Sequence, residues 1–366
     1  MKRRISNRTH KVQRTQRRQG VKSAKVRRPP TIIPAVEMHE AAHQGYTRNK
    51  PPILFDGQTH PYTEDSGATF EVQCTTCQPT RTLTVSSVCD GHAGHTASYA
   101  VTRLVQQLFQ TCIDETLGDV SSGLRILFER ITLEMTRVNI QTGTTCNVTV
   151  FDTTHERVYV ASLGDSPTLR YRKGPRGRFH LAWKSDDHDC GDTVEVERMV
   201  QIHRANGEPN ATAGDVVFQV HTATGEPTGV WRNRRTMCMT HGCFGDLSFN
   251  YYPNIVTTIP RIYVQEWLRT QRSDVWVQCT DGLLESLQPS KLGIQPCGEK
   301  RVRDICQHLD KCQSHANIAQ SLHDMQVAAI LKARKRAHPT RFDNTREWVE
   351  STFDNHLTKV FKWRRY

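Results

Sequence analysis

Aspartate stands beside glycine at the end of three segments whose composition predicts β-strands. The three pairs are Asp90-Gly91, Gly164-Asp165 and Asp281-Gly282. Glycine lets a backbone come close to a ligand, and carboxylate oxygens are the ligands that Mg²⁺ and Mn²⁺ prefer. One such pair alone indicates a tight turn. Three of them at strand ends predict a cation site, because strand ends can converge on one cavity.

A histidine follows the first of these aspartates by two residues, at His92. Two cations that share a water lower its pKa and hold a phosphoryl oxygen while the water attacks. An imidazole can protonate the leaving alkoxide near neutral pH. These residue types therefore predict metal-assisted hydrolysis of a phosphate ester.

The apolar pattern predicts the elements that must position these groups. Alternating or β-branched runs predict strands at 82–89, 145–151, 158–162, 168–172, 273–279 and 325–331. Helical spacing predicts helices at 97–117, 124–139, 194–205, 300–310 and 316–321. Strands, a hairpin and helices mixed in one segment favour an α+β fold.

The positive charge of the chain is concentrated at its N-terminus. Lys and Arg number 49 against 37 acidic residues, but residues 1–30 hold twelve of the basic residues and no acid. With few aliphatic residues to bury, residues 1–33 are predicted to be a disordered basic arm. The arm suits nucleic acid or a nuclear import receptor. A mitochondrial presequence and a solvating tail without a partner are the alternatives.

Neither a secretory segment nor a run of 18 apolar residues occurs in the sequence. We therefore expect no membrane partner, and an intracellular location in the nucleus or cytoplasm, with the mitochondrion as the alternative. The twelve cysteines are scattered, which predicts reduced thiols. The single CxxC at Cys74 and Cys77 favours a strand or turn with two incidental thiols over a zinc site.

The order of the acidic motifs resembles the protein phosphatase 2C family over roughly residues 55–332. Residues 62–65 are similar to its opening Glu-Asp motif, residues 88–95 to its Asp-Gly-His-Gly-Gly signature, and residues 161–166 to its Ala-Asn-Val-Gly-Asp-Ser block. Five further blocks follow the family order, at 142–145, 185–188, 197–207, 244–246 and 279–285. Eight ordered blocks are far more specific than any one of them.

The resemblance implies an αββα sandwich of two antiparallel sheets flanked by helices, with a site for two Mg²⁺ or Mn²⁺ ions at one end. Asp90 would bridge the ions, and the Gly91 carbonyl and a water-mediated Glu64 would complete one of them. Asp281 would bind the other ion, and His92 would be the general acid. Asp165 and Glu285 would lie near an optional third ion.

Several positions depart from the family pattern, including Pro167 in place of the arginine that usually follows Gly-Asp-Ser. The phosphate-holding arginine should fall four residues before Glu64, where the chain has His60. Imidazole cannot make the bidentate clamp of guanidinium, so either substrate affinity falls or another basic group substitutes. The family also ends with Asp-Asn before its last strand. The strand expected at 325–331 places His323 and Asp324 at this position, and His323 is itself a candidate ligand for Mn²⁺ or Zn²⁺.

Composition and the family resemblance together predict four parts of the chain: the arm at 1–33, a linker at 34–54, a phosphatase-2C-like domain at 55–332, and a charged C-terminal extension at 333–366. The extension is predicted to contain an amphipathic helix over 345–362. The resemblance implies a metal-dependent phosphatase acting on phosphoserine or phosphothreonine in a phosphoprotein substrate. A pseudophosphatase that only binds proteins is the first alternative, and a nucleic-acid-associated protein with an incidental phosphatase fold is the second.

Overall fold

The protein is described by a computed structural model, in which residues 36–43, 53–55, 58–60, 63–77, 80–221, 227–235, 240–247, 254–268, 273–284, 299–311, 317–337 and 356–363 are placed. The basic arm predicted at 1–33 lies outside these described residues. No described helix is both long enough and apolar enough to cross a bilayer.

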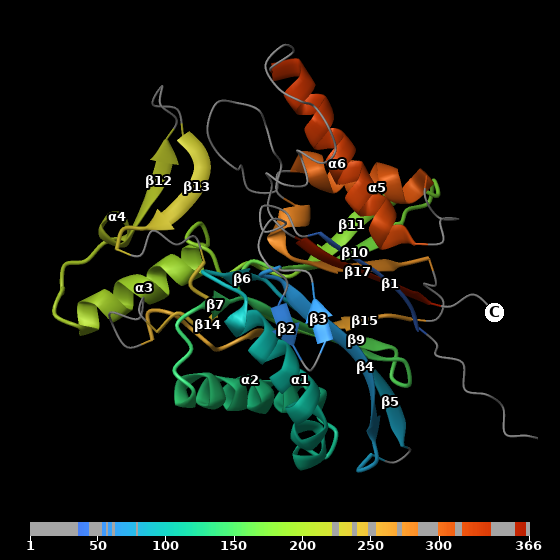
Figure 1. Cartoon of the computed structure of the whole chain (residues 1–366), viewed down its shortest axis with the longest axis horizontal. Coiled ribbons are helices and arrows are strands. Elements are labelled where there is room, and N and C mark those ends of the chain that lie inside the picture. The colour runs from blue at the N-terminus through green and yellow to red at the C-terminus, as the bar shows by residue number, and fades with distance from the viewer. Residues whose placement is uncertain are drawn as a thin grey trace, which may run out of the picture. The chain divides into compact units, whose positions relative to one another are not determined.

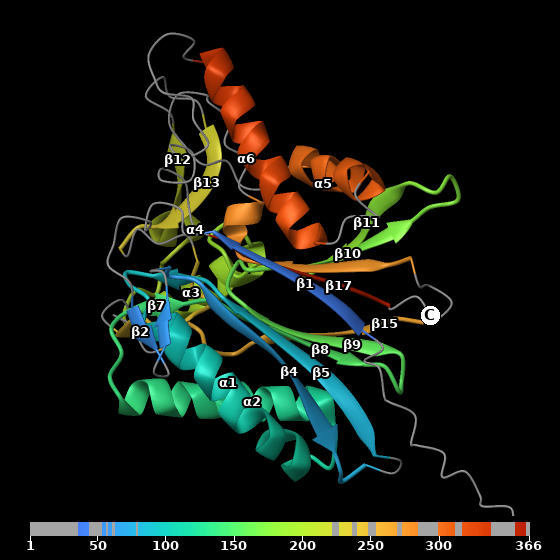
Figure 2. The same cartoon turned by 45° about the vertical axis from the view of Figure 1, so that its right-hand side comes forward.

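Two antiparallel five-stranded sheets form the centre of the fold (Figures 1 and 2). The first has the order β15-β9-β8-β5-β4, with β4 at Ser66–Cys74, β5 at Arg81–Cys89, β8 at Cys146–Asp152, β9 at Arg157–Leu163 and β15 at Arg261–Glu266. The second has the order β1-β17-β16-β10-β11, with β1 at Val36–His43, β10 at Thr168–Lys173, β11 at Phe179–Lys184, β16 at Val275–Cys279 and β17 at His356–Trp363.

The sheets pack face to face, because each turns one apolar face toward the other. Phe151 of the first sheet contacts Trp276 and Phe361 of the second. Polar pairs cross the same interface: Ser86 donates a hydrogen bond of 2.6 Å to Gln278, and the Thr149 and Thr168 hydroxyls lie 2.9 Å apart. Buried polar groups need such partners, so these pairs also fix the register of one sheet on the other.

Helices cover both outer faces (Figure 2). Helices α1 (Thr96–Glu115) and α2 (Val120–Arg137) bury their apolar sides on the first sheet, and α5 (Glu299–Lys311) and α6 (Ile318–Ala337) cover the second. Asp119 caps α2, since its carboxylate accepts the backbone N–H of Ser121 at 3.1 Å. The αββα sandwich implied by the sequence is therefore confirmed.

Smaller elements lie at the edges of the sandwich. Three two-residue strands, β6 (Gly91–His92), β7 (Gly143–Thr144) and β14 (Phe244–Gly245), form a small sheet of order β14-β7-β6. Helices α3 (Thr193–Ala205) and α4 (Ala213–Val216) precede the hairpin of β12 (Val217–His221) and β13 (Pro227–Asn233), and β2 (Ile53–Phe55) pairs with β3 (Gln58–His60).

Three sequence predictions about elements are wrong. The linker at 34–54 contains β1, which pairs with β17 along eight residues and so belongs to the sandwich. The strand predicted at 325–331 is part of α6, whose Ala319, Leu322 and Gln326 are buried at helical spacing. The helix predicted at 345–362 overlaps β17, and residues 338–355 lie outside the described residues.

The reason for the error at β17 is its place in the sheet. The strand lies between β1 and β16, and residues 357–361 are buried without interruption. A strand covered on both faces loses the alternation that identifies a half-exposed strand, so its apolar run can be mistaken for a helix.

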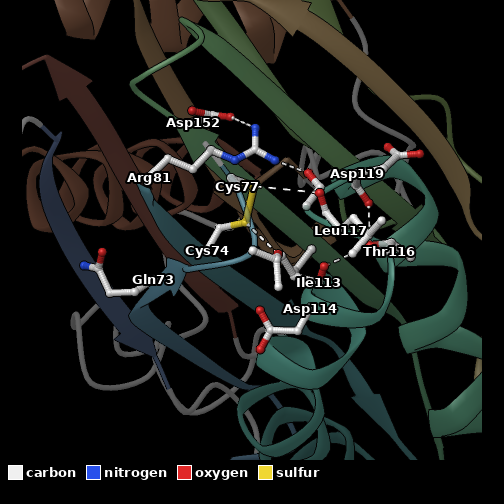
Figure 3. Close-up of a disulfide and its surroundings, with 12 residues drawn as sticks. Gln73, Cys74, Cys77, Arg81, Ile113, Asp114, Thr116, Leu117, Asp119 and Asp152 are labelled. Carbon is white, nitrogen blue, oxygen red and sulfur yellow. Dashed lines mark hydrogen bonds and ion pairs between the residues drawn. A yellow bond between two sulfur atoms is a disulfide. The ribbon is translucent and has the colours of Figure 1, made fainter. Parts of the chain in front are cut away.

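The prediction of reduced thiols is wrong at Cys74 and Cys77, which form a disulfide with Cα atoms 5.7 Å apart (Figure 3). The bend after β4 returns Cys77 to the end of the strand. Gly118 lies against the two sulfur atoms, where a side chain would overlap them. Seven other described cysteines are buried and belong to no disulfide, at 89, 112, 146, 190, 243, 279 and 306.

Candidate active site

The Asp90-Gly91-His92 motif lies where strand β5 ends and β6 begins. Gly91 packs against the backbone carbonyl of Glu64, and a β-carbon at this position would overlap that oxygen. The same carbonyl accepts a hydrogen bond from the Ser98 hydroxyl at the start of α1. Glycine is therefore required here, and its small size brings Asp90 and the buried Glu64 to the same place.

Asp90 is connected to Asp165 through the hydroxyl of Thr145. The backbone N–H of Asp90 donates to Thr145 Oγ1 at 3.1 Å, and the Asp90 carbonyl accepts from the Thr145 N–H at 2.9 Å. Thr145 Oγ1 also lies 2.6 Å from the hydroxyl of Ser166, the residue after Asp165. These contacts hold the ends of β5 and β9 side by side. Asp90 and Asp165 must be close in this way if they are to bind neighbouring cations.

Asp281 is connected to the Glu64 segment in a similar way. Thr280, at the end of β16, donates a 3.0 Å hydrogen bond to the buried carboxylate of Asp65. Asp281 then begins the short 3-10 helix η4 (Asp281–Leu283). Four segments far apart in the sequence, with Glu64, Asp90, Asp165 and Asp281, are joined by these contacts.

His92 is held by an aspartate from another strand. Strand β7 lies between β6 and β14 in the small sheet, and across it His92 Nε2 lies 2.6 Å from Asp246 Oδ2. Gly143 of β7 leaves room for this pair, since a β-carbon there would overlap both side chains. Asp246 itself has a φ of 52°, a left-handed conformation that costs energy for aspartate and occurs most often at functional sites.

The charges around His92 explain its acidity. Burial alone lowers the pKa of an imidazole, but the hydrogen bond and charge of Asp246, together with the charges of Asp165 and Glu64, raise the pKa of His92 above its ordinary value. His92 is thereby favoured as a protonated acid near neutral pH.

Burial also raises the pKa of Asp165 to about 7, and the nearby charges of Asp187 and Asp189 raise it in the same direction. A carboxyl group in this situation is stabilised in its charged form by a bound cation. The surroundings of Asp165 therefore suit a cation.

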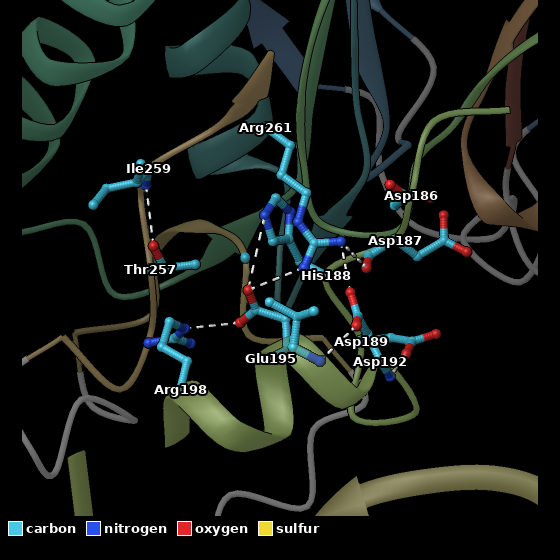
Figure 4. Close-up of polar contacts among 12 residues, drawn as sticks. Asp186, Asp187, His188, Asp189, Asp192, Glu195, Arg198, Thr257, Ile259 and Arg261 are labelled. Carbon is cyan, nitrogen blue, oxygen red and sulfur yellow. Dashed lines mark hydrogen bonds and ion pairs between the residues drawn. The ribbon is translucent and has the colours of Figure 1, made fainter. Parts of the chain in front are cut away.

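A buried network from α3 supports the turn that carries Asp165 (Figure 4). His188 Nδ1 accepts a hydrogen bond from the backbone N–H of Gly164 at 3.1 Å, and the backbone N–H of His188 donates to the Gly164 carbonyl at 2.9 Å. Behind His188, Glu195 is bound by Arg198 at 2.9 Å and by Arg261 at 3.4 Å. These contacts explain how two further sequence blocks, at 185–188 and 197–207, act on the site.

The comparisons with known proteins agree with this geometry. Residues 63–211 match the family model described as Protein phosphatase 2C. The chain carries a protein phosphatase 2C-like domain. A search of curated proteins finds no significant match to the sequence.

Two solved structures share the fold of the phosphatase-2C-like domain. The serine-threonine phosphatase 2C from Toxoplasma gondii is 17% identical, with 92% of this chain and 97% of that chain covered and a TM-score of 0.55. A sex-determining protein of C. elegans is 15% identical, with 91% of this chain and 66% of that chain covered and a TM-score of 0.52. At these identities, the two structures support the fold of the chain only. The activity must be argued from the residues of the site.

Four further residues were assigned to the site from sequence, namely His60, Glu285, His323 and Asp324. His323 and Asp324 lie within α6, where His323 is buried and Asp324 is exposed. His60 is the last residue of β3. Glu285 lies outside the described residues. The assignment of His323 and Asp324 depended on a following strand, and that strand is a helix.

The last strand of the phosphatase-2C-like domain is β17, and the two residues before it in the sequence are Asp354 and Asn355. An Asp-Asn pair followed by a strand is the order that the family resemblance implies, and it was not considered at this position from the sequence. The pair lies outside the described residues. Leu357, three residues after Asp354, donates its N–H to Thr280 Oγ1 at 3.1 Å, beside Asp281.

Two further residues of the site were also missed. Asp246 was matched as part of the block at 244–246 but received no role, and Cys243 was not considered. Cys243 Sγ lies 3.2 Å from Asp246 Oδ2. Only the pairing of β6, β7 and β14 brings these residues to His92, and strands of two residues have no periodicity to detect.

The described residues fit the metal site that the family implies. All of the donors proposed for that site are oxygens, which are the ligands that Mg²⁺ and Mn²⁺ prefer. They are the carboxylates of Glu64, Asp90, Asp165 and Asp281 and the backbone carbonyl of Gly91. The close approach of Gly91 to the backbone carbonyl of Glu64 brings the two segments that carry these donors together. We refer to these five donors as the oxygen cluster.

Proposed function

We propose that this protein is a metal-dependent protein serine/threonine phosphatase. The observation that carries the proposal is the set of hydrogen bonds that join the segments of Asp90, Asp165, Asp281 and Glu64, beside His92, whose imidazole is held by Asp246. A fold retained only for binding would have no chemical need for a paired general acid beside buried carboxylates.

Mg²⁺ or Mn²⁺, two ions and a third optional one, would supply an activated water and neutralise phosphoryl charge when bound. Asp90, Asp281 and the Gly91 carbonyl are the proposed ligands, with Glu64 acting through water and Asp165 beside the third ion. Asp354, a carboxylate, replaces His323 as the proposed metal ligand of the final block. Its support is the position of Asp354 before β17, whose Leu357 contacts Thr280.

His92 would donate the proton that the leaving serine or threonine alkoxide needs. With Nε2–H donated to Asp246, the proton on Nδ1 is the one available for transfer. Asp246 keeps the ring oriented and stabilises the imidazolium before the transfer. The buried carboxylates nearby raise its pKa in the same direction.

A guanidinium for the substrate phosphate is proposed at Arg48. In the sequence, the hairpin of β2 and β3 lies between β1 and Glu64. The position four residues before Glu64, where the family arginine is expected, therefore falls on His60 in this hairpin. Arg48 follows the end of β1 by five residues and is the only arginine between residues 36 and 80. Arg48→Ala should therefore raise KM for a phosphopeptide more than His60→Ala does, and the reverse order would restore His60.

The test is Mn²⁺-dependent release of phosphate from a phosphothreonine peptide by the full chain. We expect turnover by the wild type and a loss of roughly 10³-fold in Asp281→Asn, because several kcal/mol of charge stabilisation is removed. Asp324→Asn, an exposed change on α6, is the matched control and should retain turnover. If the wild type has no turnover with Mg²⁺ or Mn²⁺, the protein is a pseudophosphatase that binds partners.

A further inference from the structure

His92, Cys243 and Asp246 form a second group of candidate metal ligands, in which one atom from each side chain lies within 4.8 Å of the others. We call it the soft-ligand trio. Asp246 Oδ2 is central, 2.6 Å from His92 Nε2 and 3.2 Å from Cys243 Sγ. Cys243 and Asp246 are almost fully buried.

An unsatisfied oxygen points to a ligand at the trio. Asp246 is 3% exposed, and its Oδ1 has no hydrogen-bond partner among the described residues. A buried carboxylate oxygen without a partner carries an energetic cost of about 1–3 kcal/mol, and more when it is charged. A cation at the trio that both carboxylate oxygens of Asp246 bind would remove this cost.

The donor types select the ion. One imidazole nitrogen, one thiolate and one carboxylate oxygen are the ligands of Zn²⁺ sites, while Mg²⁺ avoids sulfur and nitrogen. Zn²⁺ binds these atoms at about 2.0–2.3 Å, so ligands around it lie roughly 3.3–3.6 Å apart. The 2.6 Å contact of His92 with Asp246 must widen by roughly 0.7 Å. Small rotations of the two side chains supply this change.

We propose that the soft-ligand trio binds Zn²⁺ and that the bound ion inhibits the phosphatase. Zinc takes the place of the proton between His92 and Asp246, and the Cys243 thiol proton and the Nε2 proton pass to solvent. A ring bound to zinc at Nε2 has only a neutral imidazole N–H at Nδ1, which is a far weaker acid than imidazolium. The inhibition rests on the proposed function of His92; the binding does not.

Binding is tested without enzyme activity, by adding Co²⁺ as a spectroscopic substitute for Zn²⁺ to the full chain in excess Mg²⁺. We expect a thiolate-to-cobalt charge-transfer band at one ion per chain, displaced by Zn²⁺. The band should disappear in Cys243→Ser. It should remain in Cys190→Ser, a matched buried thiol that lies 3.4 Å from the imidazole of His241 but outside the trio.

Asp246→Asn provides a second variant if Cys243→Ser fails to fold, and it should weaken zinc binding at least 10-fold. A band that is absent from the wild type, or that persists in Cys243→Ser, would overturn the site. Inhibition is measured separately, as the zinc concentration that halves the zinc-free turnover of each variant. That concentration should rise at least 10-fold in Cys243→Ser. An unchanged concentration would mean that zinc competes only at the oxygen cluster and would refute inhibition through the trio.

Discussion

The oxygen cluster and the soft-ligand trio are neighbours with opposite chemistry. The first contains only oxygen donors, four carboxylates and the Gly91 carbonyl, whereas the second contains the imidazole of His92 on β6 and the thiol of Cys243 directly before β14. His92 directly follows Gly91, so the two clusters are adjacent along the chain. The comparison teaches that one turn can serve a hard activating cation and a soft inhibitory one, because the residue type decides which ion binds.

The largest effect is expected from the carboxylate before β17. Asp354→Asn should lower Mn²⁺-dependent turnover roughly 10³-fold, because the charged oxygen ligand proposed for the final block is lost. His323→Gln should retain most of the activity, since His323 lies within α6. Steady-state phosphate release by both variants checks this. A loss in His323→Gln with activity retained in Asp354→Asn would restore the original sequence assignment.

Local parts of the fold could be predicted from the sequence. The hairpin of β8 and β9, the helices α1 and α2, and the Asp90-Gly91-His92 turn all depend on neighbouring residues whose periodicity and turn chemistry are visible in the chain. The same holds for the order of the acidic blocks, because each block is a short contiguous motif.

Parts that depend on distant pairing could not be predicted. Strand β17 forms between β1 and β16, more than 300 residues from β1 along the chain, and burial of both faces removes its alternation. Without β17, the Asp-Asn pair was sought at His323 and Asp324. The contact of Asp246 with His92 spans 154 residues and was missed for the same reason.

The next largest effect is expected at His92, the proposed general acid, which belongs to the soft-ligand trio and directly follows Gly91 of the oxygen cluster. His92→Gln should lower kcat about 10²-fold through loss of proton donation, with a smaller change in KM. Asp246→Asn should lower kcat less, about 10-fold, and change its pH dependence. Wild-type kcat should decline as pH rises through the raised pKa of His92.

Without the Asp246 charge, the lowering effect of burial gains weight, so this decline should move to lower pH in Asp246→Asn. A kcat profile against pH for both proteins measures the shift. A variant profile that coincides with the wild type would show that Asp246 does not act through the His92 proton.

The smallest effect concerns His188, which supports the oxygen cluster without binding an ion. Burial lowers the pKa of His188 from 6.5 to about 4, despite the opposing charge of Glu195. Between pH 6.5 and 4, His188 is therefore protonated in the unfolded chain and neutral in the folded chain. The free energy of unfolding should fall as pH drops through this range. The loss is about 3 kcal/mol at most.

Denaturant unfolding at several pH values measures this loss, with His188→Gln as the comparison. Glutamine keeps a hydrogen-bond acceptor for Gly164 but does not titrate, so the variant should lose less stability in acid. His241, whose pKa is also lowered to about 4 by burial, contributes equally to both proteins. Parallel pH profiles would exclude His188 as the titrating group.

Mn²⁺ binding to the full chain, measured by titration calorimetry, tests the oxygen cluster most directly. The account predicts at least two Mn²⁺ ions per wild-type chain and loss of at least one from Asp90→Asn. Cys243→Ser should keep the Mn²⁺ stoichiometry, because its thiol belongs to the soft-ligand trio. If Asp90→Asn binds Mn²⁺ as the wild type does, the oxygen cluster is not the metal site and the proposed phosphatase mechanism is contradicted.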